Sequence, residues 1–432
     1  MKWGRLLACI AVGCIGCSDN LGMESGAPKG AEVARSQLAR RVAPPLMEAD
    51  QGTFGADNRG FALALYHELA AEPGNLIFSP YSISAALAMT YAGARADTAR
   101  EMETALRYSL GQQRVHQAFN ATAQALAGRK DEGEKLDPME DFGQEGELIV
   151  VNQTWGRKGY RFLSSYLDLL AQDYGAGMFL VDFGATEPTR TLINDWVAEQ
   201  THARIQDVLP PGAISADSAL VLTNALYFKW NWLTAFAPTA TLPGVFHAEA
   251  GDQSAPMMHL ARLQLRYGEL SGFKMLQLDY NTRSLQMLLV LPPPGPLRQV
   301  AKDFDAQAFD ALYKSLEIRD VTMSMPKGRF ESERKLRAPL QALGMRAAFD
   351  LARADLSGMD GRAGLYVDQV YHKAFIVVDE EGTEAAAASS TVIQLKSAFA
   401  RVEVNFDRPF LFFIYDEPTG QALFLGHVEH ID

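Results

Sequence analysis

Cysteine is scarce in this chain and confined to one end. Cys9, Cys14 and Cys17 are the only three among 432 residues. The chain after Cys17 therefore has no disulfide and no thiol chemistry, and its stability must come from packing. Catalytic motifs are lacking too, since there is no GxSxG, HExxH, Walker loop, GxGxxG or CxxC. We therefore predict that the protein is not an enzyme and has no catalytic residue and no cofactor.

An excess of basic charge is also lacking. The net charge is −12 at pH 7, with 40 Lys and Arg against 52 Asp and Glu. Nucleic-acid binding requires basic grooves, so we expect no nucleic-acid partner. The acidic run from Asp131 to Glu147 lacks EF-hand spacing and predicts a solvated loop, not a calcium site. His427 and His430 would point to opposite faces of a strand, so no metal site is predicted there either.

The amino terminus is predicted to be a leader that exports the chain. Lys2 and Arg5 precede the apolar stretch LLACIAVGCIG, which is too short to span a membrane stably. We predict a signal peptide over residues 1–16. The sequence GCSD around Cys17 resembles a bacterial lipobox, in which the cysteine becomes acylated, and Cys14 is a second candidate. The alternative is an ordinary secretory signal with incidental cysteines.

Either leader predicts an exported protein. With lipid on Cys17 it would be a membrane-anchored lipoprotein of the outer membrane or cell surface, and without it an extracellular or periplasmic protein. Ser18 after the cysteine favours the outer membrane in a diderm cell. Residues 17–47, rich in Gly, Ala, Ser, Pro and Arg, predict a flexible tether, so a lipid anchor would be the sole membrane contact.

The remaining residues 48–432 are predicted to form a single domain. They contain no second linker, and an apolar content of 48% is ample for one large core. We expect a monomer.

Helix and strand signals come in blocks. Apolar residues spaced by four predict a helix over 56–72. A short strand then ends at Phe78, where Ser79 can cap a second helix, Pro80 suits its first turn and Gly93 can end it. Further helices are predicted over 162–174 and 191–202, and strands over 148–155, 220–228, 285–291 and 321–325. The segments FLFFIYD and ALFLGHV predict a hairpin.

This order favours an α+β fold with large, mostly antiparallel sheets over a doubly wound fold.

A long segment of small residues separates two predicted strands, 375–378 and 401–406. It contains EEGTEAAAASS, residues 380–390, and has no hydrophobic anchor, so we expect an exposed loop. With a period of two, the face that begins at Thr383 is uncharged and could be buried if the loop became a strand. Four consecutive alanines leave a surface helix as the alternative.

This run closely resembles the hinge of the serpin family of protease inhibitors, and the resemblance extends over nearly the whole chain after Ala56. NLIFSPYSISAALAMTYAGA is similar to the family's second helix, and INDWVAEQTHARIQDVL to the helix across its main sheet. LTNALYFKWNW is similar to its central strand, and VNFDRPFLFFIYDEPTGQALFLGHV to its carboxy-terminal signature. The resemblance implies the serpin fold, with about eight or nine helices and an exposed reactive-centre loop at about 380–401.

The resemblance implies a reactive bond within this loop. The family's spacing of seventeen residues, counted from Glu380, places the bond between Lys396 and Ser397. A lysine there would select trypsin-like serine proteases. Leu395 or Phe399, offered to an elastase- or chymotrypsin-like protease, is the alternative. The implied hinge consists of Glu380, Glu381, Gly382, Thr383, Glu384, Ala385, Ala386, Ala387, Ala388 and Ser389.

The resemblance also implies structural residues beneath the opening of the main sheet. Ser79, Ser82, Asn224 and His372 would form the polar cluster called the shutter, and Trp232 would lie at the top of the opening. The implied activity is suicide-substrate inhibition, in which the cleaved loop inserts into the sheet and traps an acylated serine protease. The alternative is a non-inhibitory serpin that acts as a binding or structural module.

Overall fold

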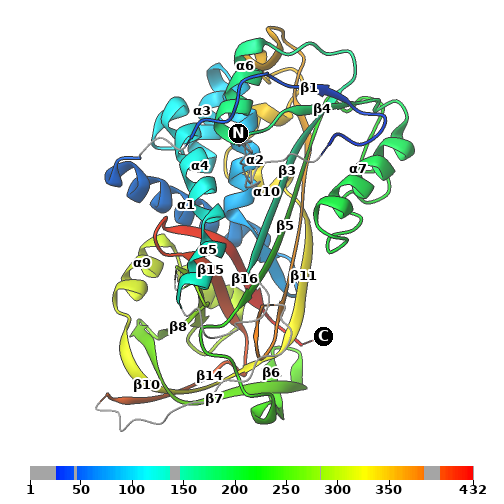
Figure 1. Cartoon of the computed structure of the whole chain (residues 1–432). Helices are drawn as coiled ribbons and strands as arrows, with labels where there is room; N and C mark the ends of the chain where they lie inside the picture. Colours follow the sequence, from blue (N-terminus) through cyan, green and yellow to red (C-terminus); the bar gives the residue numbers. More distant parts are fainter. Residues whose placement is uncertain (1–25, 43–45, 137–145, 283, 384–398, 432) are drawn as a thin grey trace, which may run out of the picture.

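The computed structural model describes residues 26–42, 46–136, 146–282, 284–383 and 399–431. Two large sheets hold the strands, and most of the helices gather at one end of the molecule (Figure 1). Most neighbouring strands are antiparallel. The prediction of an α+β fold with large, mostly antiparallel sheets is confirmed.

The first sheet has seven strands and contains the start of the hinge. Between β5 and β12 lies the two-residue strand β13, and beyond it these two strands pair directly in a parallel ladder. In spatial order the strands are β1 (Glu32–Ala34), β4 (Met178–Val181), β3 (Glu147–Arg157), β5 (Leu220–Asn231), β13 (Gly382–Thr383), β12 (Val367–Val378) and β11 (Gly328–Lys335).

The second sheet has nine strands. Its hairpin of the two carboxy-terminal strands confirms the predicted one. In spatial order the strands are β14 (Arg401–Asn405), β10 (Glu317–Pro326), β7 (Gly251–Leu270), β8 (Phe273–Asp279), β9 (Leu285–Leu291), β15 (Phe410–Asp416), β16 (Gln421–Val428) and β2 (Leu76–Phe78), and β6 (Leu242–Ala248) pairs with β7 beside this path.

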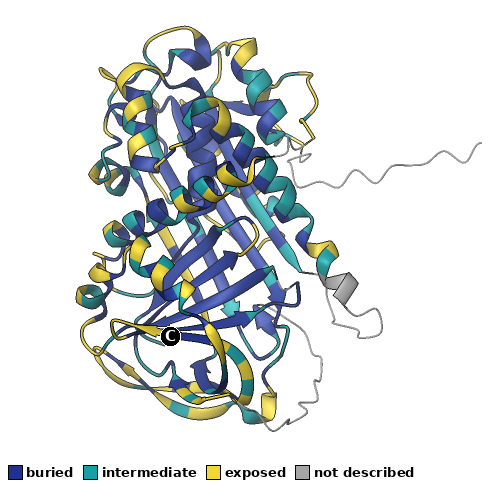
Figure 2. Ribbon diagram, turned by 90° about the vertical axis from the view of Figure 1, so that its left-hand side faces the viewer, coloured by how far each residue is buried: buried dark blue, intermediate teal, exposed yellow. Residues whose placement is uncertain are grey.

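The seven-stranded sheet is buried on both faces, because its central strands alternate between two cores (Figure 2). On β5, Leu222 faces the main core and Val221 faces a second core beneath helix α7 (Thr186–Gln200). Trp196 of α7 packs edge-on against Trp155 of β3, with ring centroids 5.4 Å apart. This helix lies across the sheet, as the resemblance implies.

The second helix forms as the sequence predicts. The Ser79 Oγ caps it by accepting a hydrogen bond of 3.1 Å from the Ser82 N–H, and Pro80 occupies the first position. Gly93 ends the helix where a Cβ would lie 2.2 Å from Met359 Cγ, so only glycine allows this close approach.

Among the described residues, none of the helices has both the length and the apolar content needed to span a membrane. The predicted helix 56–72 begins earlier, and 162–174 continues from an α-helix into a π-helical turn, η1 (Leu170–Tyr174). The α-helices besides α7 are α1 (Glu48–Leu69), α2 (Pro80–Gly93), α3 (Ala96–Leu106), α4 (Gly111–Ala127), α5 (Arg129–Leu136), α6 (Ser164–Leu169), α8 (Leu297–Val300), α9 (Ala306–Lys314), α10 (Arg337–Ala342) and α11 (Ser357–Asp360).

Residues 26–42 differ from the expected flexible tether, and we call this segment the strap. Its strand β1 pairs antiparallel with β4 and extends the seven-stranded sheet by one strand. Arg40 Nε donates a 2.9 Å hydrogen bond to Asn120 of α4, and Arg41 forms a 2.9 Å ion pair with the nearly buried Asp173. Backbone pairing and side-chain bonds therefore hold this segment on the domain, which composition alone does not reveal.

Candidate functional site at the hinge

The start of the hinge is already a strand of the seven-stranded sheet. Gly382 pairs with Asn231 and Thr383 with Trp230 on β5, and Thr383 also pairs with Val378 on β12. For these two residues the expectation of an exposed loop is wrong, because both neighbouring strands supply hydrogen-bonding partners. Glu384 to Ser389 of the hinge and the predicted reactive bond, Lys396–Ser397, lie outside the described residues, as does Cys17.

Thr383 is buried, as the alternation predicts for this residue in a strand. Its side chain has no exposed surface, and its hydroxyl lies 2.9 Å from the hydroxyl of Tyr280. Burial raises the pKa of Tyr280 above its usual range, so the phenol keeps its proton for this bond. At Gly382 a Cβ would lie 2.2 Å from the carbonyl oxygen of Trp230, so the strand can enter here only as glycine.

Trp232 follows the end of β5 and lies beside the turn that leads into the hinge. Its indole N–H donates a 3.0 Å hydrogen bond to the Asp379 carbonyl, and its backbone N–H donates a 2.8 Å bond to the Glu381 carbonyl. The ring stacks on Tyr280 with centroids 4.7 Å apart and an interplanar angle of 13°. The aromatic pair thus holds the turn that leads from β12 into the hinge.

Glu380 anchors the same turn by its carboxylate. It is 9% exposed, pairs with Lys327 Nζ at 2.5 Å and accepts a 2.8 Å hydrogen bond from the Thr241 hydroxyl. Burial would raise its pKa, but the bonds from Lys327 and Thr241 outweigh burial and leave the pKa below its usual value. Sequence reasoning missed Lys327 and Thr241, because neither lies near Glu380 in the chain.

The predicted shutter residues are brought together along the line where β5 and β12 meet. His372 and Asn224 are cross-strand neighbours, and the Ser79 N–H donates a 3.1 Å hydrogen bond to His372 Nε2. Asn224 Nδ2 donates to the Ser82 hydroxyl oxygen at 2.6 Å. Asn152 of β3 completes the cluster by accepting from Asn224 and, at 3.0 Å, from Ser82. In the sequence, Asn152 is marked only by being an asparagine within an otherwise apolar predicted strand.

This network requires a neutral imidazole at His372. Since Nε2 accepts a hydrogen bond from Ser79, the ring proton resides on Nδ1 and is donated to Asn224 Oδ1. Burial, with a smaller contribution from the charge of Arg334, lowers the pKa of His372 to about 3. The cluster therefore ties α2 and β3 to the two strands that a fully inserted hinge must separate.

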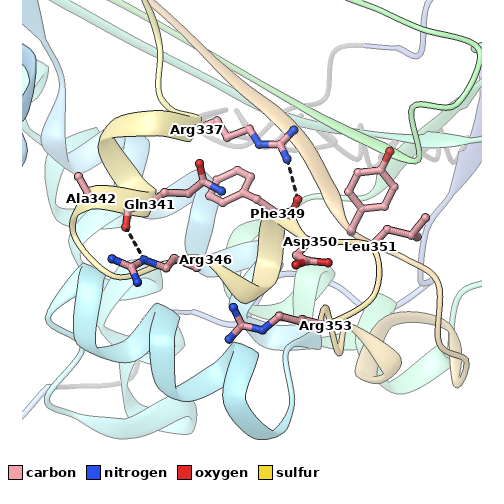
Figure 3. Close-up of a pocket in the computed structure, with 9 residues that line it drawn as sticks. Arg337, Gln341, Ala342, Arg346, Phe349, Asp350, Leu351 and Arg353 are labelled. Atoms are coloured by element: carbon pink, nitrogen blue, oxygen red, sulfur yellow. Dashed lines mark hydrogen bonds between the residues drawn. The ribbon is translucent and has the colours of Figure 1, made fainter.

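Two pockets lie among the described residues. One of about 820 Å³ lies beside β3 and reaches Trp230, and one of about 720 Å³ lies at the end of β11 away from the hinge. In the smaller, Arg337 donates to the Phe349 carbonyl at 2.9 Å, but no nucleophile faces a base (Figure 3). The described residues also include no group of three or more metal-binding side chains. The hinge remains the candidate site.

Comparison with known proteins gives the same assignment over most of the chain. Residues 56–431 match the family described as "Serpin (serine protease inhibitor)". The chain is 36% identical over 372 residues to an uncharacterized serpin-like protein of Thermococcus kodakarensis, covering 85% of this chain and 83% of that one. It is 34% identical over 385 residues to leukocyte elastase inhibitor of Sus scrofa, covering 86% and 98%.

Solved structures agree. Native tengpin, a thermophilic serpin, is similar with a TM-score of 0.81 and 26% identity, covering 93% of this chain and all of that one. Serpin48 of Tenebrio molitor is similar with a TM-score of 0.76 and 29% identity, covering 90% and all of that chain.

Proposed function

Since the chain belongs to the serpin family and has the serpin fold, we propose that it inhibits serine proteases as a suicide substrate, with Lys396–Ser397 as the reactive bond. The observation that carries the proposal is the position of Thr383, buried between β5 and β12 at the mouth of an otherwise closed sheet. The relative named leukocyte elastase inhibitor supports protease inhibition as the activity.

The register of β13 against β5 predicts how many hinge residues the sheet could accept. Thr383 opposes Trp230 in an antiparallel pair, so each further residue of the hinge would oppose the preceding residue of β5. Continued at this register, residue 393 would oppose Leu220, the first residue of β5. The new strand would then fill the whole boundary between β5 and β12 and leave Lys396 just beyond its end.

Insertion of the hinge would increase the number of backbone hydrogen bonds in the sheet. The present boundary is one parallel ladder over eight registered pairs, whereas an inserted strand would form an antiparallel ladder with each neighbour. Each additional backbone hydrogen bond contributes about 1 kcal/mol net. The buried face would receive Ala385, Ala387 and Ser389, which are small enough to lie over a filled core.

The mechanism follows from competing rates. The serine of the protease attacks the carbonyl carbon of Lys396, the peptide bond breaks, and Ser397 leaves with a new amino group. The acyl-enzyme is then carried by the inserting strand over roughly 35 Å, at about 3.3 Å per residue from the Trp230 end to the Leu220 end. If insertion precedes hydrolysis of the ester, the protease remains bound and the inhibitor is consumed.

Lys396 would be the bait residue, meaning the residue whose side chain enters the specificity pocket of the protease. A lysine there favours trypsin-like targets, because its ammonium would pair with a carboxylate in that pocket. An elastase-like target that uses Leu395 is the second candidate, and the relatives named leukocyte elastase inhibitor favour it. We further propose that the protein is an exported monomer attached to a membrane by lipid on Cys17.

One incubation with trypsin tests the proposal. We expect a covalent complex that survives SDS, together with a released carboxy-terminal fragment whose first residue, by mass spectrometry, is Ser397. A complex with a fragment that begins at another residue would retain inhibition and reject Lys396. Rapid cleavage with no complex would reject inhibition of trypsin, and the same result with leukocyte elastase would favour a non-inhibitory module.

A further inference from the structure

Exposed apolar side chains mark the outer surface of the second sheet where the chain returns from the reactive loop. Phe399 is 42% exposed and Ile318 of β10 is 48% exposed. In the parallel ladder of β14 and β10, Arg401 pairs with Asp320. If the same register is extended by two residues toward the amino terminus of each strand, Phe399 lies beside Ile318. Both side chains then lie on the solvent face, a few residues from the predicted reactive bond.

The next strand, β7, adds arginines to this face. Arg266 opposes Ile318 directly, and Arg262 lies further along, opposite Thr322. Both arginines are exposed. Arg266 reaches Glu417 at only 4.0 Å, and within the described part of the chain Arg262 has no ion pair.

The backbone at Arg262 is strained. The register between β7 and β10 shifts between Val321 and Met323, so Ala261 and Arg262 both oppose Thr322 and both are exposed. Arg262 has φ of 56°, the left-handed conformation that such a bulge ordinarily assigns to glycine. An arginine is therefore unfavourable for folding at this position, and strain of this kind is retained most often at functional surfaces.

We propose that Arg262, Arg266, Ile318 and Phe399 form a secondary docking surface for the target protease, beside the residues that follow the reactive bond. The inference rests on the proposed function. Arginine and exposed apolar side chains are enriched at protein interfaces, and an arginine without a partner of its own can pair with a carboxylate of the docked protease. At the bulge Arg262 is exposed to solvent, on the same strand as Arg266 and four residues before it.

Such a surface would change the rate at which the protease associates with the inhibitor and would leave the insertion of the cleaved loop unchanged. Charged groups at the rim of an interface change mainly the association rate and its dependence on salt. All four residues lie in the second sheet or at its edge, outside the β5–β12 boundary that opens. The association rate and the number of inhibitor molecules consumed per protease therefore separate docking from trapping.

The informative substitution is Arg262→Gly in the full chain, assayed against bovine trypsin and leukocyte elastase. Glycine relieves the left-handed strain, so we expect a higher midpoint of thermal unfolding together with association at least fivefold slower for one protease or both. The rate deficit should shrink as salt is raised. Arg262→Lys should retain most of the rate, and Ile318→Ser should lower it without a change in salt dependence.

Arg362→Gly, at an exposed arginine that follows α11, is the matched control and should leave the rates unchanged. Unchanged rates for Arg262→Gly and Ile318→Ser with both proteases would overturn the docking surface while leaving inhibition intact. A slower rate that is accompanied by greater consumption of inhibitor per protease would also overturn it, since that result points to insertion. Failure of the unsubstituted chain to inhibit either protease would instead reject the proposed function.

Discussion

The hydroxyl of Thr383 lies 2.9 Å from the hydroxyl of Tyr280, and the Tyr280 ring stacks on Trp232. One buried side chain of the hinge is thus fixed to the aromatic pair that lines the mouth of the sheet. The contact defines the register from which any further insertion must continue.

A charge at Thr383 should convert the inhibitor into a substrate. Thr383→Arg would place a guanidinium in the buried position that Thr383 already occupies, where its desolvation costs several kcal/mol. We therefore expect residue 383 to leave the sheet in the uncleaved protein and the cut loop to re-enter it more slowly than the ester is hydrolysed. We expect trypsin to cleave this variant without an SDS-stable complex, measured by gel and by the inhibitor consumed per protease. Glu384→Arg is the control, because at the register of β13 residue 384 would oppose the partly exposed Lys229, and this variant should still trap. Undiminished trapping by Thr383→Arg would contradict the insertion mechanism.

Specificity should follow the bait residue. Lys396→Leu removes the cation that a trypsin-like pocket selects, so association with trypsin should fall by at least a hundredfold and association with leukocyte elastase should rise. Rate constants for the two proteases measure this exchange. Equal trypsin rates for both forms would show that another residue occupies the specificity pocket.

The Glu380 carboxylate should contribute modestly to stability. Glu380→Ala leaves Lys327 and the Thr241 hydroxyl without their partner, and we expect the free energy of unfolding to fall by about 1 kcal/mol, measured with urea. Because its pKa is below the usual value of 4.5, this contribution is present above that pH and is lost as pH falls further. A variant as stable as the parent at pH 7 would contradict this role.

Buried neutral His372 should make the fold sensitive to mild acid. Its pKa is about 3 in the folded protein, against 6.5 for an unperturbed histidine, so between these values the unfolded chain binds the extra proton. The free energy of unfolding should therefore decline as pH falls below 6.5, by up to about 1.4 kcal/mol per pH unit from this group. His372→Asn should reduce that slope, measured by urea unfolding at several pH values.

His116 and His427 add to the decline, since burial lowers their pKa values to about 3 and about 4. As a control for the substitution itself, His202→Asn replaces an exposed histidine outside these buried positions. An identical slope for His372→Asn and the parent would show that this histidine is not among the responsible groups.

The strap should stabilise the domain through Asn120. This side chain accepts from Arg40 Nε and donates to the Arg41 carbonyl at 3.1 Å, so Asn120→Ala removes both bonds and should lower the free energy of unfolding by about 1–2 kcal/mol. Gln113→Ala, at an exposed position of the same helix, should have no effect. Equal thermal midpoints for the two variants would mean that the strap contributes little.

Local signals predicted several individual elements and the α+β class, whereas the serpin fold was implied by the family resemblance. The cap at Ser79, the proline after it and the glycine at position 93 defined α2, because each acts within one turn of its own position. The alternation also predicted that Thr383 would be buried if it entered a strand, and its side chain is buried.

Partners that depend on tertiary contact could not be predicted in this way. Gly382 and Thr383 form a strand because β5 and β12 are separated at this end of the sheet and leave room for it. The sequence of the hinge contains no information about that separation. Lys327 and Asn152 belong to the site only because distant strands bring them there. The strap was missed for the same reason, since its composition resembles a linker and its strand is defined by the edge of β4.

The strap would also influence how the molecule faces a membrane if the proposed lipid on Cys17 attaches the chain to one. Its strand pairs with β4, which pairs with the end of β3 opposite Leu220, whereas the hinge enters at Asn231, eleven residues away along β5. The strap and the hinge therefore lie at opposite ends of the sheet, and Figure 1 shows β1 at the end where most of the helices gather. If the chain is attached to a membrane through its amino terminus, the end of the sheet at which the hinge enters would face away from the membrane, where proteases in solution can reach it. Insertion would then draw the captured enzyme inward, to the end nearest the surface.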